Sequence, residues 1–274
     1  MSIELIILAG GNSKRFGRYK QIEPVTKKQE SLIELSIKGA INAGINRAII
    51  VIKSEIIEVL KSSLTKYSKY IKIVYVIQGE DMLKNRQLYG VGYALWISSK
   101  LINNNFLVIN GDDYYSSNSI EIATKALSNC NVENNHFMLG YKLKNTLFEE
   151  SNNINRGICK ISDNKILFID IATRIKIKNN ITTGYLKSKS KQFSGDEITC
   201  MNFYGFKKNI LDELDKHVNN QLNLNNEITI HDMINLLISE NKIILTSINL
   251  EDKCLGLTNI DDLEKLKKHI TKCP

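Results

Sequence analysis

The chain has 274 residues, of which 43% are hydrophobic and 24% are charged. This composition supports a substantial folded core and excludes a disordered chain. The formal net charge of +8 fits an anionic partner: a small substrate, a nucleic acid or a membrane surface. Because the basic residues are scattered rather than gathered in one block, we expect most of them to form an ordinary solvated surface.

The cysteines and histidines argue against a disulfide scaffold and against a zinc site. The five cysteines are far apart, odd in number and without a C-x-x-C pair, and the four histidines show no metal-ligand spacing. The sequence also shows neither a signal-peptide pattern nor an apolar stretch near the roughly 20 residues that span a bilayer. We therefore expect a cytoplasmic protein without a membrane partner.

Strands and helices alternate along the first part of the chain. Buried apolar runs predict strands over residues 3–9, 47–52, 71–78 and 105–110. Amphipathic spacing predicts helices over residues 31–44, 54–67, 92–101 and 119–127. In the first of these helices, Ser31 and Glu34 are expected to form a capping box. This alternation is typical of an α/β fold, a Rossmann-like and mostly parallel sheet flanked by helices.

The second part of the chain favours shorter strands in a smaller, mixed β region. We expect strands over residues 137–143, 155–161, 165–177, 198–206 and 242–250, and helices over residues 210–218, 230–240 and 259–269. The polar stretch 178–195 predicts a loop or a hairpin, and the Asn-rich stretch 219–226 predicts a mobile loop. No linker or internal repeat divides the chain, so we expect a single domain over residues 1–274.

A glycine-rich, basic loop follows the first predicted strand. It reads L-A-G-G-N-S-K-R-F-G over residues 8–17, and Lys20 and Gln21 lie just beyond it. Glycines let the backbone approach a ligand closely, and a loop of this kind after the first strand is suited to holding phosphate. The alternative is an ordinary strand-to-helix turn with solvated lysines.

Two adjacent carboxylates, Asp112 and Asp113, follow the fourth predicted strand. We expect both to face a cleft rather than the core, because ligands of parallel sheets bind at the carboxyl ends of the strands. In a phosphate-binding cleft such oxygen ligands can hold Mg²⁺. The alternative is a polar turn that caps the next helix. Gln78, at the end of the third strand, is a candidate for reading a base.

Several other activities are disfavoured by missing motifs. The loop lacks G-x-x-x-x-G-K-[ST] and G-x-G-x-x-G, and no Ser/His/Asp or Cys/His grouping lies at the strand ends. Net charge alone leaves a nucleic-acid-binding protein open, but the sequence shows no recognised module for that role. A nucleoside triphosphate site is the remaining interpretation, and we expect no nucleic-acid partner.

These motifs together resemble the sugar-phosphate nucleotidyltransferases, the nucleoside diphosphate-sugar pyrophosphorylases. The loop followed by K-Q-I-E-P resembles their signature, and Q-G-E at 78–80, Y-G-V-G-Y-A-L at 89–95 and I-N-G-D-D-Y-Y at 109–115 resemble later motifs in the same order. The stretches 138–146, 155–159 and 200–206 resemble a bacterial branch, and the resemblance extends to residues 256–259. It implies a nucleotide-diphospho-sugar transferase fold with a nucleotide-binding half (1–130) and an acceptor-binding half (131–274).

The resemblance implies a reaction between a nucleoside triphosphate and a phosphorylated small acceptor. The acceptor phosphate attacks the α-phosphorus directly, with Mg²⁺ (or Mn²⁺) as cofactor, and pyrophosphate leaves. A homodimer is compatible with the family. The rival interpretation is a catalytically inactive, nucleotide-binding or regulatory homologue of the same fold.

The resemblance also assigns roles to residues. Arg15, Lys20 and Asp112 would be catalytic: Arg15 would hold the β and γ phosphates, Lys20 the α-phosphate or the acceptor phosphate, and Asp112 the metal. Gln78 and Gly90 would contact the base edge. The full set around the nucleotide would be Leu8, Ala9, Gly10, Gly11, Asn12, Ser13, Arg15, Lys20, Gln78, Gly90 and Asp112. The acceptor site would comprise Asp113, Gly140, Arg156, Gly157, Lys176 and Asn202, with Thr258 at a second metal position.

Three positions depart from the family pattern. Ser13 stands where the loop usually has glycine, Thr173 where an acidic residue is frequent, and Thr258 where the metal site usually has a carboxylate or amide. Thr173 removes a contact to a sugar hydroxyl, so the acceptor need not be a hexose phosphate. Phosphocholine, a polyol phosphate or an amino-acid phosphate remain open as acceptors, with CTP or UTP as donor.

Overall fold

The computed structural model describes residues 2–11, 16–79, 90–130, 132–221 and 227–272. Four parallel strands form its first half, in the order β3-β2-β1-β4. They are β1 (Ile3–Leu8), β2 (Arg47–Ile52), β3 (Lys72–Ile77) and β4 (Asn105–Asn110). The helices between them are α1 (Leu32–Asn42), α2 (Ile57–Leu64) and α3 (Val91–Ser98). The predicted α/β alternation is confirmed, and so is the Ser31–Glu34 capping box of α1.

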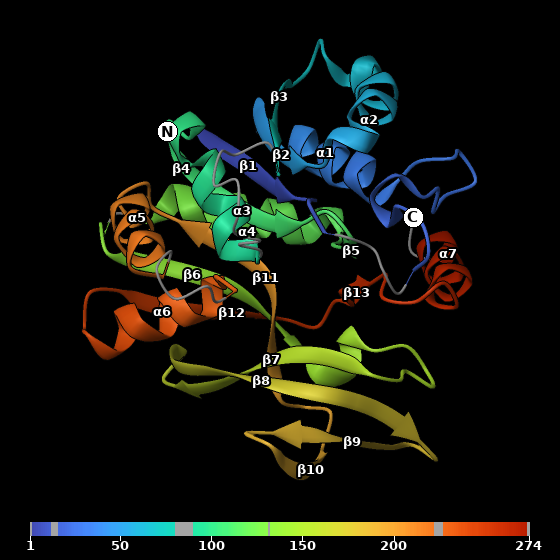
Figure 1. The fold of residues 1–274 in the computed structure, drawn as a ribbon, viewed down its shortest axis with the longest axis vertical. Helices are drawn as coiled ribbons and strands as arrows, with labels where there is room; N and C mark the ends of the chain where they lie inside the picture. The colour runs from blue at the N-terminus through green and yellow to red at the C-terminus, as the bar shows by residue number, and fades with distance from the viewer. Residues whose placement is uncertain (1, 12–15, 80–89, 131, 222–226, 273–274) are drawn as a thin grey trace.

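Alternate residues of the central strands face two separate cores. Leu5 and Ile7 of β1 pack with α1, α2 and α4 (Ser117–Asn129) on one side of the sheet. Ile6 and Leu8 pack on the other side with α3, α5 (Ile210–Gln221) and α6 (Ile230–Ser239). Figure 1 shows these helix layers on the two sides of the sheet. Burial on both faces explains the uninterrupted apolar runs in the sequence.

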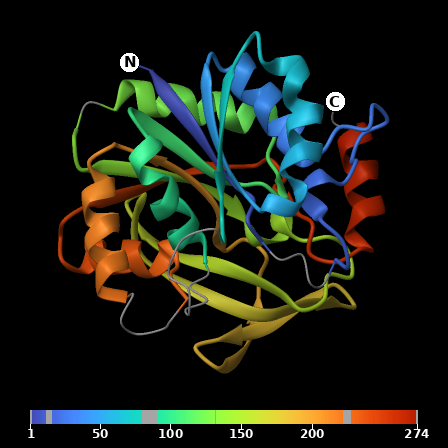
Figure 2. The ribbon, with the colours of Figure 1, turned by 45° about the horizontal axis from the view of Figure 1, so that its top comes forward.

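The sheet continues into the second half of the chain through antiparallel pairing. The strand β11 (Ile198–Phe206) runs antiparallel to both β4 and β6 (Asn135–Lys142), and β12 (Ile244–Leu250) runs parallel to β6. The remaining strands lie at one end of the molecule (Figures 1 and 2). They are β7 (Ile154–Ser162), β8 (Lys165–Lys178), β9 (Ile181–Leu186) and β10 (Lys189–Phe193).

A few elements differ from the sequence predictions. Residues 178–195 contain the β9–β10 hairpin, which is one of the two predicted alternatives. The last helix, α7 (Asp262–Lys272), starts and ends slightly later than predicted. Two short strands, β5 (Asp113–Tyr114) and β13 (Leu255–Gly256), pair with each other although the sequence shows no strand pattern there. Much of the Asn-rich stretch, residues 222–226, lies outside the described residues. Within the described part of the chain, no helix is long and apolar enough to cross a membrane.

The buried imidazole of His136, on β6, generates a prediction about stability. Its Nδ1 accepts a hydrogen bond from the Lys207 backbone N–H (3.2 Å), which requires an unprotonated ring nitrogen. Burial, with the positive charge of Lys207 as a smaller cause, lowers the pKa of His136 from 6.5 to about 4. The folded state therefore resists a proton that the unfolded chain accepts more readily.

We expect the free energy of unfolding to be full above pH 6.5 and to fall between pH 6.5 and 4, with His136 contributing on the order of 2 kcal/mol. Denaturant unfolding across this range measures the effect. In His136→Asn, whose amide oxygen can accept the same bond, the decline should be shallower. His231, whose pKa burial also lowers to about 4, stays in the variant as an internal reference. An unchanged decline in His136→Asn would contradict the assignment.

Candidate nucleotide-binding site

A hollow of about 290 Å³ lies where the carboxyl ends of β1, β3 and β4 meet. Six of the residues predicted to bind nucleotide line it, namely Leu8, Gly10, Gly11, Gln78, Gly90 and Asp112. Ala9 lies beside them and is buried at 2% exposure. The β1 loop, the end of β3, the start of α3 and the end of β4 therefore meet, although they are far apart in the sequence.

Residue 10 must be glycine for the Gln78 side chain to keep its observed position. A Cβ atom at residue 10 would overlap the Gln78 carboxamide oxygen and lie 2.7 Å from its Cδ. The Gln78 amide thus lies directly on the glycine backbone at the mouth of the hollow. Gly90 has a φ of 121°, a conformation that favours glycine, and its Cα faces the backbone of Ile228 across the start of α3.

Lys20 and Asp112 form an ion pair at the edge of the hollow. Lys20 lies in a short 3-10 helix, Lys20–Ile22, directly after the glycine loop, and its side chain is only 16% exposed. The Lys20 ammonium also donates to the Leu257 carbonyl (2.9 Å), while the Leu257 N–H donates to the Asp112 carbonyl (3.0 Å). Three distant segments thus meet around one pair of opposite charges, which neutralise each other in a partly dry environment.

Asp113 does not face the cleft, so the prediction that both carboxylates do so is wrong for this residue. Its side chain is 8% exposed and accepts a hydrogen bond from the Asn110 side-chain amide (2.8 Å). The Tyr115 hydroxyl lies 3.3 Å from the same carboxylate oxygen and donates to the Met201 carbonyl (2.6 Å). Asp113 therefore stabilises the end of β4 through contacts on the side away from the cleft. Its predicted contact with the acceptor stays a prediction.

The environment of Asp113 perturbs its titration. Burial and, to a lesser extent, the neighbouring Asp112 charge raise the pKa of Asp113 to about 6, against the opposing effects of Arg156, Asn110 and Lys20. The position also constrains the C-terminal segment. A Cβ atom at Gly256 of β13 would overlap the Asp113 carboxylate, so the β5–β13 pairing requires glycine there.

Two of the predicted acceptor residues, Gly140 and Gly157, flank the same residue of β11. Cys200 pairs with Gly140 of β6 on one side and with Gly157 of β7 on the other. The row continues to Asn249 of β12 and Ile171 of β8, so it crosses five strands. An added side chain at either glycine would be crowded, since a Cβ atom at Gly140 would lie 2.5 Å from Asn249 Oδ1 and one at Gly157 would lie 3.0 Å from Ile169 Cγ2.

Arg156 and Asn202 lie between this row and the nucleotide hollow. Arg156 donates to the Thr146 carbonyl (2.7 Å) and hydroxyl (3.2 Å), and its guanidinium is close enough to Asp113 to oppose the rise of that carboxyl's pKa. Asn202 has a φ of 54° and donates to Asn110 Oδ1 (3.4 Å). Its own side-chain oxygen is buried without a hydrogen-bond partner among the described residues, an arrangement that suits a ligand donor.

Other predicted residues lie further out. Lys176 is an exposed residue of β8 that pairs with Thr183, beyond the bulge that follows Thr173. Thr258 lies near the site, and its described contact is made by the backbone. Its N–H donates to Asp262 (3.1 Å), the first residue of α7. The predicted residues Asn12, Ser13 and Arg15 lie outside the described residues.

Three contributors were not assigned a role from the sequence. Gln21 is buried and donates from its side-chain amide to the Gly11 carbonyl (3.0 Å). This bond holds the first part of the glycine loop in place. Asn110 connects Asp113 to Asn202. Leu257 contacts the ion pair through its backbone, while its side chain is buried in an apolar cluster, so its side chain gives no sign of this role. For Gln21, its place in the K-Q-I-E-P motif was an available signal.

The donor set at the hollow fits Mg²⁺. Asp112 offers a carboxylate that is 27% exposed, and the neighbouring Asn110 and Asn202 offer amide oxygens. Magnesium prefers oxygen ligands and is commonly held by one or two carboxylates together with substrate phosphates. The described residues contain no cluster of three or more His, Cys, Asp or Glu that would bind a metal without a substrate.

A family model described as nucleotidyl transferase matches residues 4–145, which is more than half of the chain. The chain belongs to the nucleotidyl transferase family. It is therefore an enzyme that transfers a nucleotidyl group from a nucleoside triphosphate. The lining residues of the hollow lie within the matched region, with the exception of Glu227. A comparison with curated proteins gave no significant match.

Solved structures share the whole fold of this nucleotidyl transferase at low sequence identity. A protein assigned as a glucose-1-phosphate thymidylyltransferase from Bacillus anthracis, in complex with sucrose, is 15% identical over 98% of this chain and 95% of its own, with a TM-score of 0.71. The inositol-1-phosphate CTP transferase from T. maritima is 12% identical over 98% and 96%, with a TM-score of 0.69. A UDP-glucose pyrophosphorylase complexed with UDP-glucose is 16% identical over the full length of both chains, with a TM-score of 0.65. The predicted fold class is thereby confirmed.

The Gly10–Gln78 contact predicts matching effects of two different substitutions. In Gly10→Ala the new methyl group displaces the Gln78 amide, a flexible side-chain end, so stability changes little while the amide leaves its position. Gln78→Ala removes the amide outright. We expect both variants to relax the preference among nucleoside triphosphates, measured as relative dissociation constants by calorimetry.

The double variant should behave like either single variant, because both remove one interaction. Additive effects would show that Gly10 acts independently of Gln78. An unchanged nucleotide preference in Gln78→Ala would exclude this amide from base recognition.

Proposed function

We propose that this enzyme joins the nucleotidyl group of a nucleoside triphosphate to a phosphorylated small acceptor, with Mg²⁺ as cofactor and pyrophosphate as the leaving group. The observation that carries the proposal is the Lys20–Asp112 pair at the edge of a hollow lined by Gly10, Gly11 and Gln78. It supplies a cation for phosphate and a carboxylate for metal at the carboxyl ends of parallel strands, where ligands of such sheets bind.

In this proposal the residues of the first half, 1–130, bind the nucleotide. The backbone at Gly10 and Gly11 lies against the base and phosphates, and Gln78 and Gly90 contact the edge of the base. Arg15 holds the β and γ phosphates that leave as pyrophosphate, and Lys20 holds the α-phosphate or the incoming acceptor phosphate. These residues neutralise negative charge and align the reacting groups, which is the main source of acceleration in phosphoryl chemistry.

Asp112 is the residue that would hold the divalent cation, together with oxygen atoms of the bound triphosphate. The cation would lower the electrostatic barrier to the approach of two anions. Among the described residues, Lys20 is the cation that pairs with Asp112, and the pair keeps both groups in position for the reaction. Asn110 and Asp113 position this end of β4 from behind. A contribution of Thr258 to a second metal contact stays part of the proposal.

The acceptor binds, in this proposal, in the second half, residues 131–274. Gly140 and Gly157 let neighbouring side chains pack closely against β11. Arg156 supplies a cation, and Asn202 supplies an amide oxygen that has no hydrogen-bond partner among the described residues. The exposed Lys176 would reach the acceptor phosphate only at the outer end of the site. Because Thr173 replaces the usual acidic residue, we include phosphocholine, polyol phosphates and amino-acid phosphates beside sugar phosphates as acceptors.

The relatives guide the choice of donor and setting. Their names include a thymidylyltransferase, a CTP transferase and a UDP-glucose pyrophosphorylase. These names support testing pyrimidine nucleotides first, beginning with CTP and UTP. We further propose a cytoplasmic location, which the free thiols of the four described cysteines support, and a homodimer without nucleic-acid or membrane partners.

The test is pyrophosphate release from each nucleoside triphosphate with Mg²⁺ and a panel of phosphorylated acceptors. Release that requires one particular donor and acceptor, and that Asp112→Ala abolishes, would support the proposal. Tight nucleotide binding without release across the panel would instead support the inactive, nucleotide-binding alternative. Binding of no nucleotide at all would overturn both.

Substitution of the phosphate-binding cations should reduce turnover. We expect Lys20→Ala and Arg15→Ala each to lower kcat/KM by at least about a hundredfold, the loss typical of a preorganised charge contact. Steady-state pyrophosphate release measures the change.

Lys28→Ala is the matched control, because it removes one exposed lysine from the loop that follows Lys20 and should leave the rate near wild type. A near-wild-type rate in Lys20→Ala or in Arg15→Ala would remove that residue from the catalytic set.

A further inference from the structure

A second cavity, separate from the nucleotide hollow, lies between the loop that precedes α1 and the C-terminal half of α7. Its volume is about 590 Å³, against about 290 Å³ for the nucleotide hollow, and the two share no lining residue. Figures 1 and 2 show α7 beside this loop, away from the β8–β10 strands. A volume of this size is in the range of small-molecule sites.

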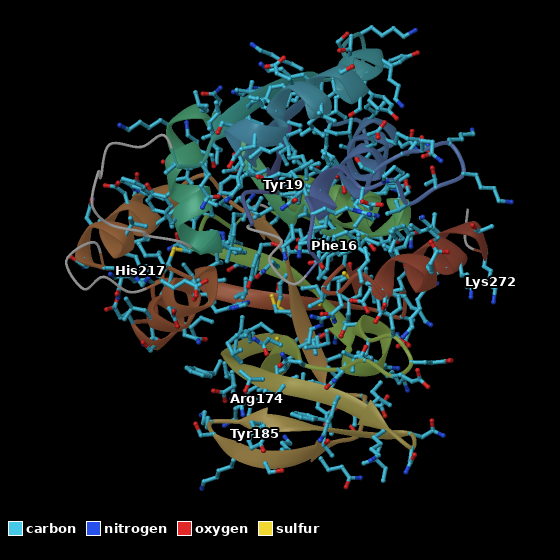
Figure 3. All side chains as sticks on the ribbon, turned by 45° about the vertical axis from the view of Figure 1, so that its right-hand side comes forward. Phe16, Tyr19, Arg174, Tyr185, His217 and Lys272 are labelled. Carbon is cyan, nitrogen blue, oxygen red and sulfur yellow. The ribbon has the colours of Figure 1, made fainter. Side chains whose placement is uncertain are left out.

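Lysines from both walls face this cavity. Lys27 comes from the loop, and Lys267, Lys268 and Lys272 come from one side of α7. Figure 3 shows Lys272 at the outer end of α7. Positive charge on the last turn of a helix also complements the helix dipole, which would explain Lys272 alone. It does not explain Lys27, which belongs to the opposite wall.

The cavity contains little negative charge to balance these lysines. Glu23 is the carboxylate among the lining residues, and Arg18 neutralises it through two hydrogen bonds of 2.6 Å. Lys267 lies 3.1 Å from Glu264, but that pair is exposed and weakly held. The remaining lysines leave a net positive pocket that would attract an anion.

The rest of the wall is suited to hold a ligand of moderate size. Val25 packs with Leu263 and Leu266 of α7 in a small apolar cluster that fixes the two walls against each other. Gln29, another lining residue, has a φ of 61°, a conformation uncommon for a residue with a side chain. Its amide adds a polar group beside the lysines, whereas the hydroxyls of Thr26 and Thr271 already donate to the Glu30 carboxylate (3.1 Å) and to the Lys267 carbonyl (2.8 Å).

We propose that this cavity is a second, non-catalytic binding site for a small phosphorylated anion, either free pyrophosphate or the phosphates of a nucleotide. Phosphate oxygens suit the convergent ammonium groups, because charge-assisted hydrogen bonds are roughly twice as strong as neutral ones. The inference stands on the cavity and its charges and does not require the proposed acceptor or donor.

The walls of the cavity connect directly to the candidate active site. The loop wall continues from the 3-10 helix that carries Lys20, and α7 begins at Asp262, which accepts hydrogen bonds from the N–H groups of Thr258 and Asn259 (3.1 and 2.7 Å). Leu257, the partner of Lys20, comes immediately before. An anion that holds the two walls together therefore acts on both segments that meet at Lys20.

The experiment is calorimetric titration of inorganic pyrophosphate, in metal-free buffer, into four proteins: the wild type, Lys20→Ala, a cavity variant and a control variant. The cavity variant is Lys27→Ala/Lys268→Ala/Lys272→Ala. The control, Lys178→Ala/Lys189→Ala/Lys191→Ala, removes the same charge from exposed positions on β8 and β10. Thermal melting establishes that each variant is folded.

We expect one pyrophosphate site to persist in wild type, in Lys20→Ala and in the control, and to weaken at least about tenfold in the cavity variant. A parallel titration with CTP distinguishes the sources: tighter binding than pyrophosphate identifies a nucleotide, and weaker binding identifies the free anion. Equal affinities in the cavity and control variants would overturn the inference. Loss of the site in Lys20→Ala would also overturn it, by assigning the anion to the active site instead.

Discussion

The Lys20–Asp112 ion pair is the constraint on which the candidate site depends. It joins the segment after the glycine loop to the end of β4, and the Leu257 backbone closes the arrangement by accepting from Lys20 and donating to Asp112. Each partner alone would be a partly buried charge without compensation, which is strongly unfavourable. The cluster therefore holds loop, sheet and C-terminal segment at fixed positions before any substrate arrives.

Most of the fold could be predicted because its signals are local and periodic. The strands β1, β2 and β4 are mostly apolar, and α1 carries both its amphipathic spacing and its capping box in contiguous residues. The β5–β13 pair could not be predicted, since each strand has two residues and forms only because tertiary contacts bring Asp113 and Gly256 together. Prediction from sequence patterns uses residues that are close along the chain, and Asp113 and Gly256 are distant in sequence.

The same limit separates the parts of the site that were predicted from those that were not. Gln78 and Asp112 were identified because the carboxyl ends of parallel strands converge, which follows from topology alone. Gly90, at the start of α3, was assigned only through the resemblance to the family. The burial of Asp113 was missed, because nothing in two adjacent aspartates shows that one points to the cleft and the other to Asn110 and Tyr115. The role of Leu257 was missed for a different reason, because every residue type has the backbone carbonyl that accepts from Lys20.

The contact between Lys20 and Leu257 also has a consequence for folding during synthesis. Synthesis proceeds from the N-terminus, so β1 to β4 leave the ribosome before Leu257, which lies 237 residues after Lys20. A chain that stops before Leu257 holds Lys20 without its backbone acceptor, so the completion of the site depends on the synthesis of this later segment.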